Sequence, residues 1–322
     1  YTVKEISAPA GFIVDATAHD VNVKPEETST VKSSDIPQNN PISLILQKLD
    51  LETGEGQPQG NSSLANAEFT IKFYTELSDT DPAASGKKPV RTWVMKTNAS
   101  GEMHFTKDYF VSGDEFYYAS DKKTVCLPIG TVTIQETKAP KNYFLNETVF
   151  VQKITGSGSQ ESVSIYNASS VEERVYRGGV KVQKRDLETQ DTVSQGNATL
   201  AGATFSITTL NEQPVWVNGK LYQKDEMCLT IITDENGLAS TEEKALPVGH
   251  YRIEETQAPT GYLKDGAKTL EFEITKDGEM VDLTSKDTSI ANQVIRGGVK
   301  VQKRDIETGE TKPQGNATLE GA

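Results

Sequence analysis

Short stretches of the chain alternate between apolar and polar residues. Clear examples are Val-Lys-Val at 180–182, Phe-Ser-Ile at 205–207 and Tyr-Arg-Ile at 251–253. A period of two is typical of β-strands with one buried face, and no window keeps the 3.6-residue apolar period of an amphipathic helix. Turn-forming sequences such as 98–101 and 234–237 separate these runs. The pattern therefore predicts an all-β fold.

The chain also repeats itself over long distances. The sequence Arg-Gly-Gly-Val-Lys-Val-Gln-Lys-Arg-Asp stands at 177–186 and again at 296–305. A lysine motif that opens each repeat and a Glu-x-x-Ala-Pro motif near its end occur three times each, with key residues at Lys48, Lys184 and Lys303 and at Glu5, Glu136 and Glu255. Self-similarity at this spacing indicates tandem domains rather than a short-repeat solenoid.

The order of these motifs predicts the domain boundaries, because the chain starts with a closing motif and ends with an opening one. We expect the C-terminal remnant of a preceding domain with its linker at 1–40, complete domains at 41–170 and 171–295, and the start of a following domain at 296–322. Each complete domain is predicted to be an immunoglobulin-like β-sandwich of about seven short strands. Extra residues near 75–88 and 108–124 lengthen the first one, where we expect long hairpins or surface loops.

Polar residues occur where the alternation predicts a buried side chain. Residues two apart in a strand share a face, so Lys184 lies on the face of Val180 and Val182. The same count places a lysine, a glutamate and an asparagine in the core of each complete repeat. These sets are Lys48, Glu136 and Asn167 in the first complete domain, Lys184, Glu255 and Asn292 in the second, and the incomplete Glu5, Asp35 and Lys303 in the truncated ones.

Two interpretations of these buried groups are open. An isolated buried charge costs several kcal/mol, so the residues could form a Lys–Glu ion pair beside a hydrogen-bonded asparagine. Alternatively, burial lowers the pKa of the lysine and raises that of the glutamate, which gives a neutral amine nucleophile and a protonated carboxyl group. Attack of the lysine Nζ on the asparagine Cγ would then release ammonia and leave an isopeptide bond. The recurrence of all three residues in two domains favours the chemical interpretation, with one ammonia lost from each.

The motifs resemble those of a known domain family. Lys-x-Asp, Leu-x-x-Ala-x-Phe, Leu-Pro-x-Gly-x-Tyr and Glu-Thr-x-Ala-Pro-x-Gly-Tyr all occur in the second complete domain. They are similar to motifs of the Cna protein B-type, or SpaA-type, prealbumin-like domains, which build stalks of Gram-positive pilins and wall-anchored adhesins. The resemblance implies a Lys184–Asn292 bond with Glu255 as catalyst and a Lys48–Asn167 bond with Glu136 as catalyst.

The first complete domain matches the family pattern less closely. Val132 stands in place of the tyrosine of one turn motif, and Lys141-Asn142 occupies the usual glycine position of the other. These departures affect the turns more than the reactive residues. The assignment of Asn167 also depends on where the last strand ends.

Composition excludes several function classes. The 322 residues carry a net charge of −13, which argues against nucleic acid or an anionic membrane as the main partner. Three His and two Cys leave little material for a zinc site or a His-based triad, and no cofactor is expected. No stretch approaches the roughly 20 apolar residues needed to span a bilayer, so no membrane insertion is expected. Cys126 and Cys228 have apolar neighbours and are predicted to be buried free thiols.

The sequence and the resemblance together predict a stalk segment of a Gram-positive cell-surface protein or pilin. Such a protein is extracellular and anchored to the cell wall, with its signal peptide and anchor outside this chain. Its partners would be the neighbouring domains, with other pilin subunits or a host-surface ligand as further candidates. The main alternative is an adhesin module that binds a host or matrix ligand directly. An exported enzyme using Glu136 or Glu255 is the third interpretation, whereas crosslinking itself is a single-turnover reaction and not ordinary enzymatic activity.

Overall fold

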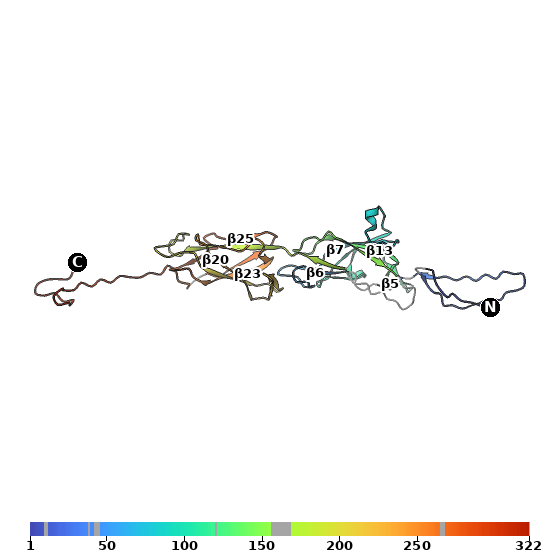
Figure 1. Cartoon of the computed structure of the whole chain (residues 1–322), viewed down its shortest axis with the longest axis horizontal. Coiled ribbons are helices and arrows are strands. Elements are labelled where there is room, and N and C mark those ends of the chain that lie inside the picture. Colours follow the sequence, from blue (N-terminus) through green and yellow to red (C-terminus); the bar gives the residue numbers. More distant parts are fainter. Residues whose placement is uncertain are drawn as a thin grey trace.

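The protein is an end-to-end array of β-sandwiches. The computed structural model describes residues 1–9, 12–37, 39–41, 46–119, 121–155, 169–264 and 268–321. Two sandwiches follow one another along the long axis, and the terminal segments continue from them at opposite ends (Figure 1). The all-β prediction is confirmed, because the helical elements of the described residues are two short 3-10 turns, η1 (Pro82–Ser85) and η2 (Lys107–Tyr109). Within that described part, no helix is long and apolar enough to cross a membrane.

The first sandwich packs a five-stranded antiparallel sheet against two smaller sheets. The large sheet consists, in spatial order, of β10 (Phe110–Gly113), β8 (Arg91–Lys96), β7 (Glu68–Tyr74), β13 (Gly130–Lys138) and β14 (Val149–Ile154). The smaller sheets are β15 (Ser169–Glu173), β6 (Leu46–Asp50) and β9 (Glu102–Met103), and β11 (Tyr117–Tyr118), β12 (Val125–Pro128) and β5 (Asn39–Pro41). The predicted insertion at 108–124 therefore contributes the strands β10 and β11.

The second sandwich has the same plan with a four-stranded main sheet. This sheet consists of β20 (Met227–Ile232), β17 (Thr204–Thr209), β23 (Gly249–Gln257) and β24 (Leu270–Ile274). The opposite layer is built on β16 (Arg177–Asp186), which pairs with β21 (Leu238–Ser240), β22 (Leu246–Pro247), β25 (Met280–Leu283) and β26 (Ile290–Asn292). A hairpin of β18 (Val215–Val217) and β19 (Lys220–Tyr222) completes the domain.

Each sandwich pairs its first strand with its last strand in parallel. In the first domain β6 pairs with β15, and in the second β16 pairs with β25 and β26. Parallel strands require a crossover connection, and here nearly the whole domain forms that connection. The two ends of each domain therefore leave in opposite directions from adjacent strands.

The two cores differ in composition. The first is rich in aromatic side chains, with Trp93 packed edge-on against Phe105 at 5.0 Å between ring centroids. The second is mainly aliphatic around Val180, Val182 and Ile207. Both cysteines are buried free thiols, as predicted. Burial raises the pKa of Cys126 to about 11 and that of Cys228 to about 12, so both are unreactive thiols at neutral pH.

The segments that flank the two sandwiches form little regular structure. At the N-terminal end β1 (Thr2–Val3) pairs with β3 (His19–Asp20), and β2 (Phe12–Ile13) pairs with β4 (Ile36–Pro37). At the C-terminal end the described residues 296–321 contain no strand. Val299 and Val301, which would face a core in a complete domain, are 92% and 85% exposed.

Candidate functional site

The second domain brings its three predicted site residues together between its two layers. Lys184 comes from β16 and Asn292 from β26 in one layer, whereas Glu255 comes from β23 in the other. The alternation along each strand directs these side chains inward, next to Val182, Ile253 and Ile290. The exposed fraction is 0% for Lys184 and 1% for both Glu255 and Asn292. The site is therefore closed to solvent.

The contacts within this site are direct. Lys184 Nζ lies 2.9 Å from Glu255 Oε1 and also contacts Asn292 Oδ1. Asn292 Nδ2 donates hydrogen bonds of 2.7 Å to Glu255 Oε2 and 2.7 Å to the carbonyl oxygen of Leu263. One carboxyl group thus reaches the amine with one oxygen and the amide nitrogen with the other.

The surroundings of Lys184 disfavour the charged form of its amine. Burial lowers the pKa of Lys184, and the neighbouring Glu255 only partly offsets this effect. The contact between Nζ and Oδ1 places the amine beside the Cγ atom to which that oxygen is bonded. In an attack of Nζ on Cγ, the Oδ1 atom would carry the developing charge, and the bonds from Nδ2 fix the plane of the amide. The arrangement therefore holds a nucleophile, an electrophile and a proton-transfer group in one dry pocket.

A second set of buried polar residues supports the end of β16. Tyr262 donates a 2.8 Å hydrogen bond to Asp186 Oδ2, and Gln195 Nε2 donates one of 2.9 Å to the same oxygen. Burial and the adjacent carboxylate raise the pKa of Tyr262 to about 12, so the hydroxyl stays a donor. The sequence analysis did not single out Asp186 or Gln195. Their recurrence at fixed distances after each lysine, as Asp50 and Gln59 in the first domain, was the available signal.

The first domain brings two of its three predicted residues together. Lys48 and Glu136 are 0% and 2% exposed, and Lys48 Nζ donates a 2.5 Å hydrogen bond to Glu136 Oε1. Glu136 Oε2 accepts a 2.8 Å bond from the backbone N–H of Asn146. The ring of Phe69 lies 5.4 Å from Lys48 Nζ and helps to cover it. Asn167 lies outside the described residues, so its pairing with Lys48 stays a prediction.

Comparison with known proteins identifies the domains. The family profile of the SpaA prealbumin-like fold domain matches residues 47–169 and 180–289. The chain belongs to this family. A collagen adhesin of Staphylococcus aureus is 29% identical over 121 residues, which are 38% of this chain and 9% of the adhesin.

Two solved structures are similar to this chain over most of its length. The Bacillus anthracis TIE protein is 25% identical over 91% of this chain and 41% of its own, with a TM-score of 0.48. The shaft pilin SpaA of Lactobacillus rhamnosus GG is 16% identical over 79% of this chain and 100% of its own, with a TM-score of 0.29. The chain spans well under half the length of the collagen adhesin and of the TIE protein.

The predicted site residues of the two terminal segments lie apart from one another and from the sites of the two domains. Glu5 is half-buried and accepts a 2.5 Å hydrogen bond from the backbone N–H of Asp15. Asp35 is half-buried, and Lys303 is exposed. Among the described residues, no predicted site residue contacts any of these three.

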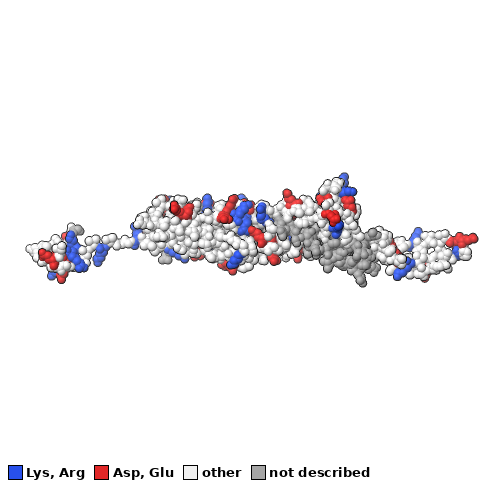
Figure 2. Space-filling view, viewed as in Figure 1, with Lys and Arg blue, Asp and Glu red and all other residues white. Residues whose placement is uncertain are grey.

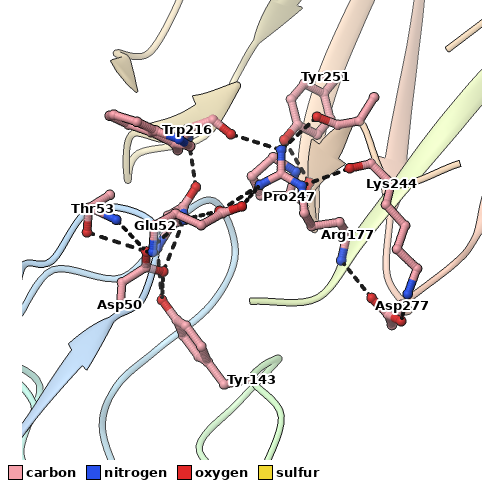
Figure 3. Close-up of polar contacts among 12 residues, drawn as sticks. Asp50, Glu52, Thr53, Tyr143, Arg177, Trp216, Lys244, Pro247, Tyr251 and Asp277 are labelled. Carbon is pink, nitrogen blue, oxygen red and sulfur yellow. Dashed lines mark hydrogen bonds and ion pairs between the residues drawn. The ribbon is translucent and has the colours of Figure 1, made fainter. Parts of the chain in front are cut away.

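An arginine at the start of the second SpaA domain joins it to the first (Figure 3). Arg177 Nη1 reaches the two carboxylate oxygens of Glu52 at 2.9 and 2.7 Å. Its Nε and Nη2 donate to backbone carbonyl oxygens of the second domain, at 2.8 Å to Lys244, 2.9 Å to Trp216 and 2.7 Å to Ala245. All five guanidinium donors are thus satisfied. Sequence reasoning missed this clamp, although Glu52 and Glu188 stand at equal distances after Lys48 and Lys184.

Backbone contacts and apolar packing make the junction continuous. Gln59 Oε1 accepts a 2.7 Å bond from the backbone N–H of Trp216. Gly60 has a φ of +55° and donates to the carbonyl of Pro214 at 3.0 Å, and a Cβ at this position would lie 2.2 Å from the carbonyl oxygen of Val248. Leu64 of the first domain belongs to the buried cluster of the second. The junction therefore requires glycine and leaves little freedom between the two domains.

Proposed function

We propose that this chain is a stalk segment of a Gram-positive cell-surface protein or pilin, with its second domain stiffened by an autocatalytic Lys184–Asn292 isopeptide bond. The observation that carries this proposal is the contact of Lys184 Nζ with the Asn292 side chain inside a closed pocket, where Glu255 touches both reacting groups.

The chemistry needs only these three residues. Neutral Lys184 Nζ attacks Asn292 Cγ, and the C–N bond to Nδ2 breaks as the new amide forms. Glu255 Oε1 accepts a proton from Nζ, and the same carboxyl group returns a proton to Nδ2, which contacts Oε2. Nδ2 therefore leaves as ammonia. The carboxyl group ends as it began. The reaction turns over once, so the domain is its own substrate and not an enzyme.

The bond would act where tension is applied. Lys184 lies near the end of the first strand and Asn292 in the last strand, and β16 and β26 are neighbours. A bond between them encloses 108 residues. In the chain-entropy account of crosslinks, closing such a loop stabilises a domain by about 4–5 kcal/mol. Tension applied at the two ends of the domain would pass through the covalent bond instead of the hydrogen bonds.

The surface and the junction suit a spacer. Positive and negative residues are interspersed along the face in Figure 2, which does not favour nucleic acid. The Arg177–Glu52 clamp and the shared buried cluster join the two domains end to end. We place the protein outside the cell and attached to the wall, in keeping with the collagen adhesin and pilins it resembles. Its partners would be neighbouring domains, other pilin subunits or a host ligand.

Intact mass under denaturing conditions tests this proposal. Formation of the Lys184–Asn292 bond removes the mass of one ammonia, and a digest will contain one branched peptide holding both residues. Glu255→Gln should restore the full mass. Glu254→Ala is the matched control, because Glu254 lies on the exposed face of the same strand. An unbranched Lys184 peptide in the wild-type protein would disprove the bond.

A specific feature supports the adhesin alternative. A hollow of about 480 Å³ opens beside the insertion of the first domain. Its lining is Lys107, Phe110, Gly113, Asp114, Glu115, Phe116 and Tyr118. Aromatic side chains next to charged ones are typical of a binding surface. Binding of the chain to immobilised collagen tests this function, and Phe110→Ser should abolish binding if the hollow is the site. A stalk without ligand-binding activity would give no binding in either form.

A further inference from the structure

The register of the last strand identifies the acceptor position of each domain. Lys184 lies opposite Ile290 in the parallel pair of β16 and β26, and Asp186 lies opposite Asn292. In the first domain β6 is the equivalent of β16. There Lys48 lies opposite Val171 in the parallel pair of β6 and β15, and Asp50 lies opposite Glu173. The register position that Asn292 fills in the second domain is thus filled by Glu173 in the first.

Asp50 and Asp186 show that the two lysine strands are aligned correctly. Each follows its lysine by two residues, and each accepts a 2.8 Å hydrogen bond from a buried tyrosine, Tyr143 for Asp50 and Tyr262 for Asp186. The same alignment pairs the backbone N–H of Lys48 with the carbonyl of Gly101 and that of Lys184 with the carbonyl of Gly237, each at 2.7 Å.

Contacts beyond the acceptor position agree with this register. A bridge joins Tyr143 to Val175 in the first domain, and the matching bridge joins Tyr262 to Val294 in the second. Val175 follows Glu173 by two residues, as Val294 follows Asn292. The pairing of β15 with β6 is continuous from Ser169 to Glu173. Asn167 could reach the acceptor position only if this pairing slipped by six residues.

We propose that the first domain forms no Lys–Asn isopeptide bond and keeps Lys48 as an ammonium ion paired with Glu136. This inference rests on the proposed function only in taking the second domain as the crosslinked reference. Glu173 has no amide nitrogen to release as ammonia. A carboxylate is also a poor electrophile, so the residue at this register position offers the lysine no amide carbon to attack.

The contacts of Glu136 support the ionic form. One oxygen accepts a hydrogen bond from Lys48 Nζ at 2.5 Å, and the other accepts one from the backbone N–H of Asn146 at 2.8 Å. The Glu136 carboxyl group thus binds the lysine and a backbone N–H, whereas the Glu255 carboxyl group binds the lysine and the side-chain amide of Asn292. The pair is fully buried, so it holds the first strand against the main sheet without a covalent bond. The chain would then contain one domain closed by a covalent bond and one closed by an ion pair.

Peptide mapping of the whole chain tests this proposal separately from the proposed function. The wild-type protein should lose one ammonia in total, with Lys48 in an unbranched peptide and Lys184 in the branched one. The state of Lys184 decides the proposed function, and the state of Lys48 decides this inference. A branched peptide that links Lys48 to Asn167 with loss of ammonia, or to Glu173 with loss of water, would overturn it.

Exchange of the acceptor gives the sharper test. Glu173→Asn should create a second branched peptide, Lys48 to residue 173, and a second loss of ammonia. Glu172→Asn is the matched control, because Glu172 lies opposite Leu49, one register position away, and should leave Lys48 unbranched. The reciprocal Asn292→Glu should leave Lys184 unbranched. A folded Glu173→Asn protein, with wild-type near-ultraviolet circular dichroism, whose Lys48 peptide stays unbranched would refute the assignment of the acceptor position.

Discussion

The two complete domains share a buried Lys–Glu pair and differ in the residue at the acceptor position. Both bury a lysine from the first strand against a glutamate of the main sheet, at 2.5 Å in the first domain and 2.9 Å in the second. In the second domain an asparagine completes the site, whereas Glu173 stands at that register position in the first. The same Lys–Glu pairing between the first strand and the main sheet thus occurs with two different residues at the acceptor register position. The acceptor residue alone would decide whether a buried ion pair becomes a crosslink.

The hydrophobic cores of the two domains differ at an equivalent position, which suggests how the first domain could be stable without a crosslink. Trp93 lies opposite Ile71 in the main sheet, at the place where Leu229 lies opposite Ile207 in the second domain. Trp93 also stacks on Phe116 at 6.3 Å between centroids. A buried tryptophan removes more apolar surface from water than a leucine does, and aromatic pairs add about 0.5–1.5 kcal/mol each. At this position the first domain, which we propose to lack the crosslink, has the larger apolar side chain.

Mechanical stretching of the whole chain should give the largest difference between the two domains. The first domain is expected to unfold and lengthen, whereas the second withholds the 108 residues between Lys184 and Asn292. At full extension this difference is roughly 360–390 Å. Single-molecule force spectroscopy measures it directly. Equal extensions of the two domains would contradict the proposal that only the second is crosslinked. Glu173→Asn should abolish the long extension of the first domain.

Removing the acceptor of the second domain should make it behave like a domain without a crosslink. Asn292→Ala is expected to lower its free energy of unfolding by about 4–5 kcal/mol, because the open loop restores entropy to the unfolded chain. Two-transition calorimetry measures the change. The transition of the first domain should move little, since Asn292 does not contact it. A variant as stable as the wild type would mean that no bond had formed.

The sequence predicted that the lysines and glutamates are buried, and the structure confirms this, whereas the Asn167 acceptor stays a prediction because it lies outside the described residues. Lys48, Glu136, Lys184 and Glu255 follow several alternating apolar residues, so parity alone places them in the core. The acceptor depends on which short segment forms the last strand, and the apolar alternation before Asn167 looked like such a strand. Counting back four residues from the next Arg-Gly-Gly motif in each repeat gives Glu173 and Asn292, the two positions on which the proposed difference between the domains rests.

The junction was beyond sequence reasoning for a different reason. Arg177 and Glu52 are 125 residues apart and belong to different domains. No local period links them, and exposed arginines and glutamates are common on any domain surface. Only the end-to-end docking of the two sandwiches brings the pair together. By contrast, the fold class followed from local alternation and turn chemistry, which act within a few residues.

The buried tyrosines give a smaller contrast that depends on pH. Tyr262→Phe removes a hydrogen bond to Asp186 and should lower the stability of the second domain by about 1–2 kcal/mol at neutral pH. The pKa of Tyr262 is raised to about 12, above that of an unfolded tyrosine near 10. Because the unfolded chain loses its proton first, the wild-type advantage should be complete below about pH 10 and vanish as the pH approaches about 12. Denaturation of the wild type and of Tyr262→Phe across this pH range measures the difference in their free energies of unfolding. A difference that does not change with pH would contradict the raised pKa of Tyr262.

The smallest effect is expected at the clamp between the domains. Arg177 binds the two carboxylate oxygens of Glu52 at 2.9 and 2.7 Å, and Glu52→Gln leaves it one neutral acceptor. This change should weaken the coupling between the domains by about 1 kcal/mol. Small-angle scattering should then report a wider range of angles between the domains, with both domains folded. Glu188→Gln is the matched control, because Glu188 pairs with Arg296, whose side chain is 63% exposed against 13% for Arg177. If both variants bend the chain equally, the clamp does not set the angle between the first and second domains.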